Sequence, residues 1–262
     1  MKKIAIIGGG NLGTAIALGL IKSEFIAAQD ITITKRNLNT LAGLEGIGVK
    51  VTSDNVEAVK NSDTIILAIK PFQVKEVLEL VAPGLSEKHL LISVVTGVSL
   101  EEMKTVVQKN IPLFRAMPNT AIAIQQSITC ISTTSKDEDD KKYVNGLFSQ
   151  LGKIAQIDEK LMNAATVLGA CGTAYAMRYI RANIQGGIEI GFDAATASLI
   201  AAQTVKGAAE LLLTTHTHPE QEIDKVTTPK GCTIAGLNEM EHQGFSSSLI
   251  KGIVASYNKI GN

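Results

Sequence analysis

The sequence lacks several residue types that particular classes of protein require. Tryptophan is absent from the 262 residues and aromatic residues make up only 4%, so few side chains can stack on bases or sugars. The three cysteines, Cys130, Cys171 and Cys232, are widely separated and form no Cys-x-x-Cys pair, so neither a disulfide framework nor a zinc site is indicated. His216 and His218 have no third ligand at a suitable spacing, and we expect no bound metal.

An excess of one charge and long apolar runs are lacking as well. Lys plus Arg equals Asp plus Glu at 25 each, so no overall field favours nucleic acid or an anionic membrane. No apolar run is long enough to cross a bilayer, and the first one is too short for a secretory signal. We therefore expect a cytoplasmic protein with neither a nucleic-acid nor a membrane partner.

What the sequence does contain is a glycine-rich turn close to its start. The apolar run at residues 4–7 leads into Gly8, Gly10 and Gly13, and an apolar helical pattern follows directly. This is G-x-G-x-x-G between a strand and a helix, the context that indicates dinucleotide binding. Gly8 would allow the tight turn, Gly10 the approach of a pyrophosphate, and Gly13 the packing of helix on strand. The alternative is a glycine-rich turn without a ligand, which this context makes the weaker interpretation.

Strand-like apolar runs alternate with helical patterns through the first half of the chain. These runs are residues 4–7, 31–34, 49–52, 64–69, 90–95, 127–133 and 154–157. The alternation predicts an α/β fold with a doubly wound, Rossmann-type parallel sheet, in which the weakly alternating run 127–133 is an edge strand. Beyond residue 158 helical periodicity dominates. We therefore expect a dinucleotide-binding domain at residues 1–158 and an all-helical domain at residues 159–262.

The loop after the second predicted strand lacks an acidic residue. In NAD-binding versions of the pattern, an Asp or Glu about 20 residues past the glycines binds the ribose 2′-hydroxyl. Thr34, Lys35 and Arg36 occupy this region instead. The two cations favour a 2′-phosphate and therefore NADPH, with NADH as the second choice. An ordinary solvated loop is the competing interpretation.

Two later stretches carry candidate polar groups. Lys70-Pro71 breaks regular structure after a predicted strand, at the sheet edge where α/β proteins bind ligands. Asn119 could offer a donor and an acceptor near a nicotinamide, or simply belong to a turn.

The stretch at residues 224–236, DKVTTPKGCTIAG, interrupts the helical pattern of the second half. Pro229 and Gly231 shape a turn just ahead of a helix that we expect to start near Thr233. Consecutive N–H groups at such a helix start can hold a small carboxylate. A polar turn between two helices is an equally good interpretation of the spacing.

Taken together, these motifs resemble those of the pyrroline-5-carboxylate reductase family. The resemblance covers essentially the whole chain, in order: GGGNLG, Lys70-Pro71, RAMPN at 115–119, ACGTAY at 170–175 and VTTPKGCTIAG at 226–236. The last two motifs resemble the family's GSGPAY and VTSPGGTTIAG. The chain departs from them at Cys171, Thr173, Thr228, Lys230 and Cys232.

The resemblance implies an enzyme that transfers a hydride from NADPH to the C=N bond of 1-pyrroline-5-carboxylate, giving L-proline in the last step of proline biosynthesis. It also implies a homodimer formed through the helical domain, which can assemble into a larger ring. The active site would then combine the nucleotide-binding domain of one subunit with the helical domain of a neighbour.

The expected site residues follow from the turns and the resemblance together. Thr233, at the ring nitrogen, and Lys70, near the nicotinamide, are the expected catalytic residues. The expected substrate-binding residues are Asn119, Val226, Thr228, Lys230, Gly231, Cys232 and Thr233. The expected cofactor-binding residues are Gly8, Gly10, Asn11, Leu12, Gly13, Thr34, Lys35, Arg36, Asn55, Ala68, Ile69, Lys70, Pro71, Thr96 and Glu159.

Two other functions remain open at this point. One is a reductase of another cyclic imine or of a hydroxy acid, for which Lys206 is the one candidate catalytic lysine within a predicted helix. The other is a non-catalytic NADP-binding regulator, which the departures at Thr173, Lys230 and Cys232 support best.

Overall fold

An eight-stranded sheet forms the centre of the first of two compact units, which ends at Cys171 in a computed structural model that describes residues 2–260. The strand order is β3-β2-β1-β4-β5-β6-β7-β8. This is the doubly wound order of dinucleotide-binding sheets, extended by two strands, so the predicted fold class is confirmed. The strands are β1 Ile4–Ile7, β2 Ile31–Thr34, β3 Lys50–Thr52, β4 Thr64–Leu67, β5 Leu90–Ser93, β6 Leu113–Met117, β7 Ser127–Thr133 and β8 Gly152–Gln156.

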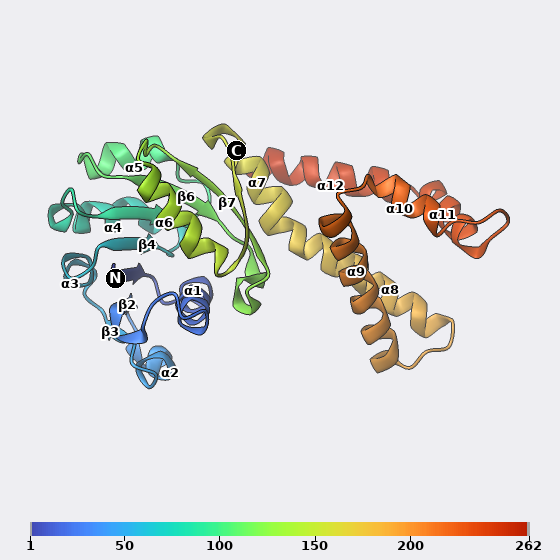
Figure 1. The fold of residues 1–262 in the computed structure, drawn as a ribbon, viewed down its shortest axis with the longest axis horizontal. Coiled ribbons are helices and arrows are strands. Elements are labelled where there is room, and N and C mark those ends of the chain that lie inside the picture. The colour runs from blue at the N-terminus through green and yellow to red at the C-terminus, as the bar shows by residue number, and fades with distance from the viewer. Residues whose placement is uncertain (1, 261–262) are drawn as a thin grey trace. The chain divides into compact units, whose positions relative to one another are not determined.

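Helices cover both faces of this sheet (Figure 1). They are α1 Asn11–Lys22, α2 Ala42–Glu45, α3 Asn55–Lys60, α4 Val74–Val81, α5 Leu100–Val107, α6 Glu138–Ser149 and α7 Met162–Ala165. Because the strands are buried on both faces, they read in the sequence as continuous apolar runs.

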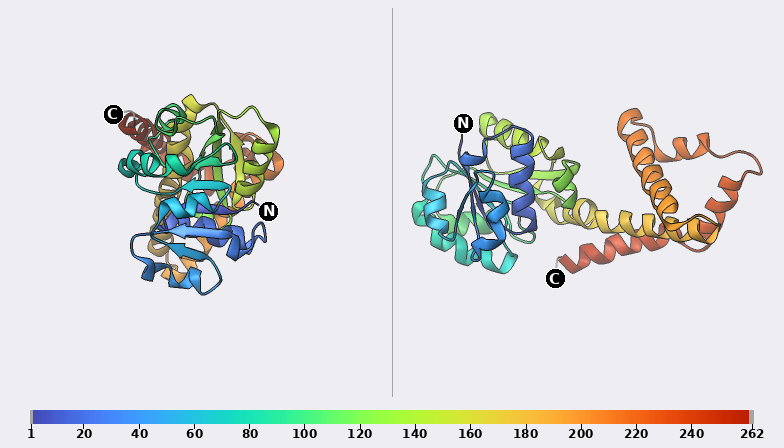
Figure 2. Two further views of the ribbon diagram at one scale, coloured as in Figure 1. Left: turned by 90° about the vertical axis from the view of Figure 1, so that its left-hand side faces the viewer. Right: turned by 90° about the horizontal axis from the view of Figure 1, so that it is seen from below.

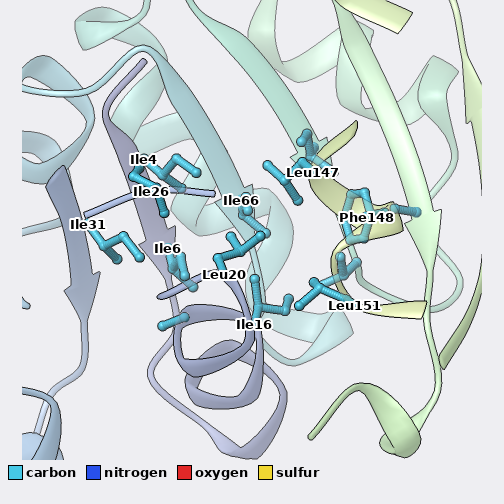
Figure 3. Packing of buried hydrophobic residues seen from close by; sticks show 14 of the residues in the cluster. Ile4, Ile6, Ile16, Leu20, Ile26, Ile31, Ile66, Leu147, Phe148 and Leu151 are labelled. Atoms are coloured by element: carbon cyan, nitrogen blue, oxygen red, sulfur yellow. The ribbon is translucent and has the colours of Figure 1, made fainter. Parts of the chain in front are cut away.

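Two apolar cores lie on opposite faces of the sheet. Alternate residues of a strand point to opposite faces, so Ile4 and Ile6 join the core beneath α1 and α6 (Figure 3), whereas Ala5 and Ile7 join the core beneath α3, α4 and α5. The two cores anchor β1 from both sides and thereby fix the start of the glycine-rich turn.

The end of the sheet differs from the prediction in two ways. Residues 127–133 are not an edge strand, because β7 lies between β6 and β8 and runs antiparallel to β6. Only residues 118–126 connect β6 to β7, which is too short for a parallel crossover. The predicted strands also do not include β6, because Arg115 interrupts its apolar run.

The second unit, Gly172–Ile260, is all helical. Its helices are α8 Gly172–Glu189, α9 Ala194–Thr215, α10 Pro219–Lys225, α11 Cys232–His242 and α12 Phe245–Ile260. Figure 2 shows α8 and α12 as two long helices of this unit, and they touch where the Tyr175 hydroxyl lies 2.6 Å from that of Ser256 and Tyr179 packs against Phe245. None of the helices in the described part of the chain is long and apolar enough to span a bilayer.

This helical unit buries little apolar surface of its own. Within residues 172–260 of the single chain, only Ala197 and Ala201 are buried apolar residues, whereas Met177, Leu199 and Leu213 are among many large apolar side chains left exposed. Since exposed apolar patches of this extent mark interaction surfaces, the unit is built to be covered by a partner.

Candidate functional site

A cleft of about 830 Å³ lies where β1, β2, β4 and β5 end. Parallel strands bring their carboxyl ends to one edge of a sheet, so the loops that follow them line a common hollow. Among the described residues, the lining contains the cations Lys35, Arg36 and Lys70 and no carboxylate. This charge balance suits a ligand rich in phosphate.

The cleft brings together all the predicted cofactor-binding residues except Gly13 and Glu159. The sequence patterns do not predict several other lining residues, namely Ile7, Gly9, Asn37, Ser53, Gln73, Val77, Val94 and Val95. Most of them lie within one or two positions of a predicted residue, so extending each predicted segment along its loop would have found them.

The three glycines of the first turn have different surroundings. Gly8 has a φ of +113°, and a Cβ there would lie 2.4 Å from the carbonyl oxygen of Ala68. A Cβ on Gly13 would lie 2.1 Å from the carbonyl oxygen of Gly8, so only glycine lets α1 pack this closely on the turn. A Cβ on Gly10 would meet nothing within 4 Å, which leaves open space beside the backbone.

The N-terminus of α1 lines the cleft with Gly10, Asn11 and Leu12. Gly10 is the N-cap residue and has no side chain that could accept a hydrogen bond. The first amides of the helix, including those of Asn11 and Leu12, therefore have no capping side chain. These amides and the positive end of the helix dipole form an anion site. The glycine-rich turn therefore fits the pyrophosphate of a dinucleotide.

Thr34 at the end of β2 holds the glycine turn in place. Its hydroxyl accepts a hydrogen bond from the amide of Gly8 at 3.3 Å, and its carbonyl oxygen accepts one from Gly9 at 2.7 Å. Lys35 and Arg36 follow directly, and neither takes part in an ion pair within residues 2–260. Both cations are therefore available to a phosphate.

Lys70 and Thr96 line the cleft from the segments that follow β4 and β5. Lys70 is exposed at the start of the short 3₁₀ helix Pro71–Gln73, and its amide donates to Gln73 Oε1 at 3.3 Å. The Thr96 hydroxyl donates to the Met117 sulfur on β6 at 3.9 Å.

The side-chain amide of Asn119 is engaged at both ends within the chain. Its oxygen accepts from the amide of Ala121 at 3.0 Å, and its nitrogen donates to the carbonyl oxygen of Gly169 at 3.1 Å. Gly169 belongs to the π-helical turn Thr166–Cys171. Asn119 thus links the loop after β6 to this turn, and it is not among the residues lining the cleft.

The predicted substrate-binding residues of the second unit gather in one turn before α11. The Gly231 amide donates to the Thr228 carbonyl oxygen at 2.9 Å. A Cβ on Gly231 would lie 2.5 Å from Thr228 Oγ1 and 3.0 Å from the Thr228 carbonyl oxygen, so a larger residue would require the Thr228 side chain to move. Gly231 is the N-cap of α11 and offers no side-chain cap, which leaves the amides of Cys232 and Thr233 without a capping side chain. This helix start resembles the first glycine turn on a smaller scale and suits a carboxylate.

Lys230 occupies an unusual backbone conformation in this turn. Its φ is +60°, the left-handed region that glycine adopts most easily, and it follows Pro229 as in a type II turn. A lysine therefore stands where the backbone favours the glycine of the VTSPGGTTIAG pattern. The side chain is exposed and takes part in no ion pair within the described chain.

The predicted site residues divide between the two units. The expected cofactor-binding residues, together with Asn119, lie before Gly172, and Val226 to Thr233 lie in the unit Gly172–Ile260. No group of three or more His, Cys, Asp or Glu in residues 2–260 could hold a metal ion.

Two family models match the chain. Residues 159–262 match the model described as pyrroline-5-carboxylate reductase dimerisation. Residues 3–97 match the model described as NADP oxidoreductase, coenzyme F420-dependent. The first match covers the helices of the second unit, and the second covers the glycine turn and all the residues that line the cleft.

Individual relatives match over nearly the whole chain. Pyrroline-5-carboxylate reductase 1 of Dictyostelium discoideum is 47% identical over 98% of this chain, which spans about half (49%) of that relative's length. Pyrroline-5-carboxylate reductase 2 of the same organism is 42% identical over 98% of this chain and 92% of its own length. The crystal structure of Plasmodium falciparum pyrroline carboxylate reductase with NADP bound is 27% identical, covers 99% of this chain and 97% of its own, and superposes with a TM-score of 0.90.

Proposed function

This chain belongs to the pyrroline-5-carboxylate reductase family, and we propose that it reduces 1-pyrroline-5-carboxylate to L-proline with NADPH. The family and the class of oxidoreductase predicted from the sequence are confirmed, and the structure of a relative with NADP bound supports the predicted cofactor. The single observation that carries the assignment of the cleft is its lining, which combines three cations, an uncapped helix start and no carboxylate among the described residues.

The residues of the cleft fit the parts of a dinucleotide phosphate. The amides of Gly10, Asn11 and Leu12 would hold the pyrophosphate, because their N–H groups lack capping partners. Lys35 and Arg36 would pair with the 2′-phosphate. When bound, NADPH supplies the hydride that the C=N carbon of the cyclic imine accepts. Lys70 would lie on the nicotinamide side of the cleft, as the Lys-Pro motif implies.

The second-unit turn would hold the imino acid. The turn from Thr228 to Thr233 would bind its carboxylate through the uncapped amides of Cys232 and Thr233, and the Thr233 hydroxyl would hydrogen-bond the ring nitrogen. Since a cyclic imine is readily protonated in water, it reaches the enzyme as an electrophilic iminium and needs no strong general acid. Orienting the reactants then supplies most of the catalysis, and proximity alone can lower a barrier by roughly 7–11 kcal/mol.

We place the functional boundary between the two domains at residues 158 and 159, as predicted. The start of the dimerisation family model at residue 159 supports it. In the single chain, residues 159–171 cluster with the sheet, and the compact helical unit begins at Gly172. The short segment 159–171 would then belong to the helical domain by its family match, although it packs with the sheet in the single chain.

The dimerisation family model supports a homo-oligomer. We propose the finer arrangement that the resemblance implies, a homodimer joined through the helical domain and able to form a larger ring, with each active site completed by a neighbouring subunit. The exposed apolar side chains of α8, α9 and α12 support it. We also propose a cytoplasmic location, as expected from the sequence.

A direct assay tests this function. The purified chain is incubated with 1-pyrroline-5-carboxylate and NADPH, and both the loss of reduced-nicotinamide absorbance and the formation of L-proline are followed. We expect one proline for each NADPH oxidised. Tight NADPH binding without consumption would instead favour a non-catalytic regulator. Consumption only with a six-membered imine or an oxo acid would favour one of the other reductases.

A further inference from the structure

Arg115 is a buried charged residue that the mechanism above leaves unused. It lies on β6 with only 4% of its surface exposed. Its Nη1 donates to Glu159 Oε1 at 2.7 Å. Its Nε and Nη2, together with Glu159 Oε2, are buried and have no hydrogen-bond partner among the described residues. Burying these groups is costly, and an apolar pair of similar volume would often be as stable, so stability alone does not explain the pair.

Glu159 connects this arginine to the start of α5. The same carboxylate oxygen accepts a hydrogen bond from the amide of Leu100, the first residue of α5, at 3.1 Å. Ser99 and Glu102 satisfy two neighbouring amides through a capping box. The amide and hydroxyl of Ser99 hold the pKa of the Glu102 carboxyl below its ordinary value, and the charge of Arg115 adds to this effect. Arg115 therefore lies where two carboxylates converge on one helix start.

The segment that ends at this helix start forms a wall of the cofactor cleft. Residues 94–99 connect β5 to α5, and Val94, Val95 and Thr96 line the cleft. Strand β6 holds this loop at two points. Met117 accepts the hydrogen bond of the Thr96 hydroxyl, and Arg115 holds the Leu100 amide through Glu159.

We propose that Arg115 is a positioning residue for cofactor binding, which acts through Glu159 to fix the 94–99 loop against the cleft. The inference rests on the proposed function only in taking NADPH as the occupant of the cleft. An ion pair that merely stabilised the sheet would have no reason to reach the amide at the end of this loop.

Cofactor affinity and loop protection test the proposal together. The dissociation constant for NADPH is measured by nucleotide fluorescence, without substrate and well below each variant's melting temperature. Amide hydrogen exchange is measured for residues 94–100. We expect Arg115→Met to weaken NADPH binding about tenfold, the size of one charge-assisted hydrogen bond, and to speed exchange in this segment. Arg115→Lys should recover part of both effects.

A control variant and two further variants separate a positioning role from a general loss of stability. Glu138→Gln removes the exposed Lys141–Glu138 pair of the same unit, outside the cleft, and should bind NADPH like the wild type. In a Glu159→Gln background, Arg115→Lys should add little further loss if the arginine acts through Glu159. If Arg115→Met does not fold, Arg115→Lys and Glu159→Gln carry the test, and unchanged affinity and exchange in both overturn the proposal.

The outcomes separate this proposal from the proposed function. If the variants lose stability while NADPH affinity and loop exchange stay at the wild-type values, Arg115 has only a structural role. The proposed reductase function would still stand in that case. If the wild type binds NADPH but reduces no imine, the proposed reaction fails, whereas weaker binding by Arg115→Met still supports the positioning role.

Discussion

A single added methyl group would meet very different surroundings at Gly10 and at Gly13. At Gly13 it would lie 2.1 Å from a backbone oxygen of Gly8, which no side-chain movement relieves. At Gly10 it would project into open space. The G-x-G-x-x-G spacing predicts different roles for these glycines, and the structure identifies the atoms that impose them.

These surroundings predict opposite results for two alanine variants. Gly13→Ala should lower the free energy of unfolding by about 1–3 kcal/mol, because the turn must shift to admit the methyl group. Gly10→Ala should unfold at nearly the wild-type denaturant concentration but bind NADPH at least about tenfold more weakly, because its methyl group would occupy the space proposed for the pyrophosphate. Denaturant unfolding and cofactor titration measure both. Equal effects of the two variants on stability would contradict this assignment.

Thr233 offers a second test at the residue scale. Thr233→Ala should lower turnover about tenfold or more, through loss of one buried polar contact worth roughly 1–3 kcal/mol. Thr233→Ser keeps the hydroxyl and should retain most of the activity. Steady-state kinetics with both substrates compare them. Unchanged kinetics in the alanine variant would remove Thr233 from the mechanism.

At the scale of elements, the start of α5 combines partners that are close in the sequence with one that is distant. Ser99 and Glu102 are three positions apart in the chain, which is the spacing of a capping box, and the structure contains that box. The third partner, Glu159, is 59 residues from Leu100 in the sequence, so no local pattern could indicate it.

The Glu102 cap should make stability depend on pH in the acid range. The pKa of Glu102 is lowered in the folded chain, first by the hydrogen bonds from Ser99. Its contribution to the free energy of unfolding is therefore complete above the ordinary pKa of glutamate and is lost as the pH falls through the lowered pKa. Glu102→Gln should therefore lose less stability than the wild type on acidification. Thermal unfolding across this pH range measures it, with Glu101→Gln as the neighbouring control. Parallel pH profiles of wild type and Glu102→Gln would show that the cap does not titrate with folding.

The loop after β2 is the element expected to select the cofactor. The wild type should use NADPH more efficiently than NADH, and Arg36→Gln should lower kcat/KM for NADPH about tenfold while changing that for NADH little, because only NADPH carries the 2′-phosphate. Lys60→Gln, which removes an exposed cation outside the cleft, is the control. Equal efficiency of the two cofactors in the wild type would count against the role of Lys35 and Arg36.

At the scale of the whole molecule, the two units differ in how they bury apolar surface. The first has a complete core on each face of its sheet, whereas the described second unit leaves most of its large apolar side chains exposed in the single chain. A helix bundle with so little core of its own depends on association for stability.

The apolar side chains of the helical unit should therefore be needed for dimerisation. Leu199 on α9 is 70% exposed, and Leu199→Asp should convert the proposed dimer to a monomer with reduced helix content, because a charge would be buried in the proposed interface. Ile47→Asp alters an apolar residue of the first unit that is 49% exposed and should leave the dimer intact. Light scattering and circular dichroism measure both. A stable Leu199→Asp dimer would place the interface elsewhere.

The sequence by itself determined the features that depend on neighbouring residues. Glycine spacing and apolar periodicity were enough to predict the first turn, the doubly wound sheet and the helical second half, because each depends on local conformation. Together with the family resemblance they also predicted more than half of the residues that line the cleft. The enzyme class was predicted from the resemblance of the motifs to those of a known family.

Only the tertiary structure decided what depends on residues far apart in the chain. It placed β7 inside the sheet, engaged both ends of the Asn119 amide, and joined Arg115 to Glu159 and Leu100. These contacts arise because the sheet topology brings distant segments together, and no periodicity in the sequence records such an encounter.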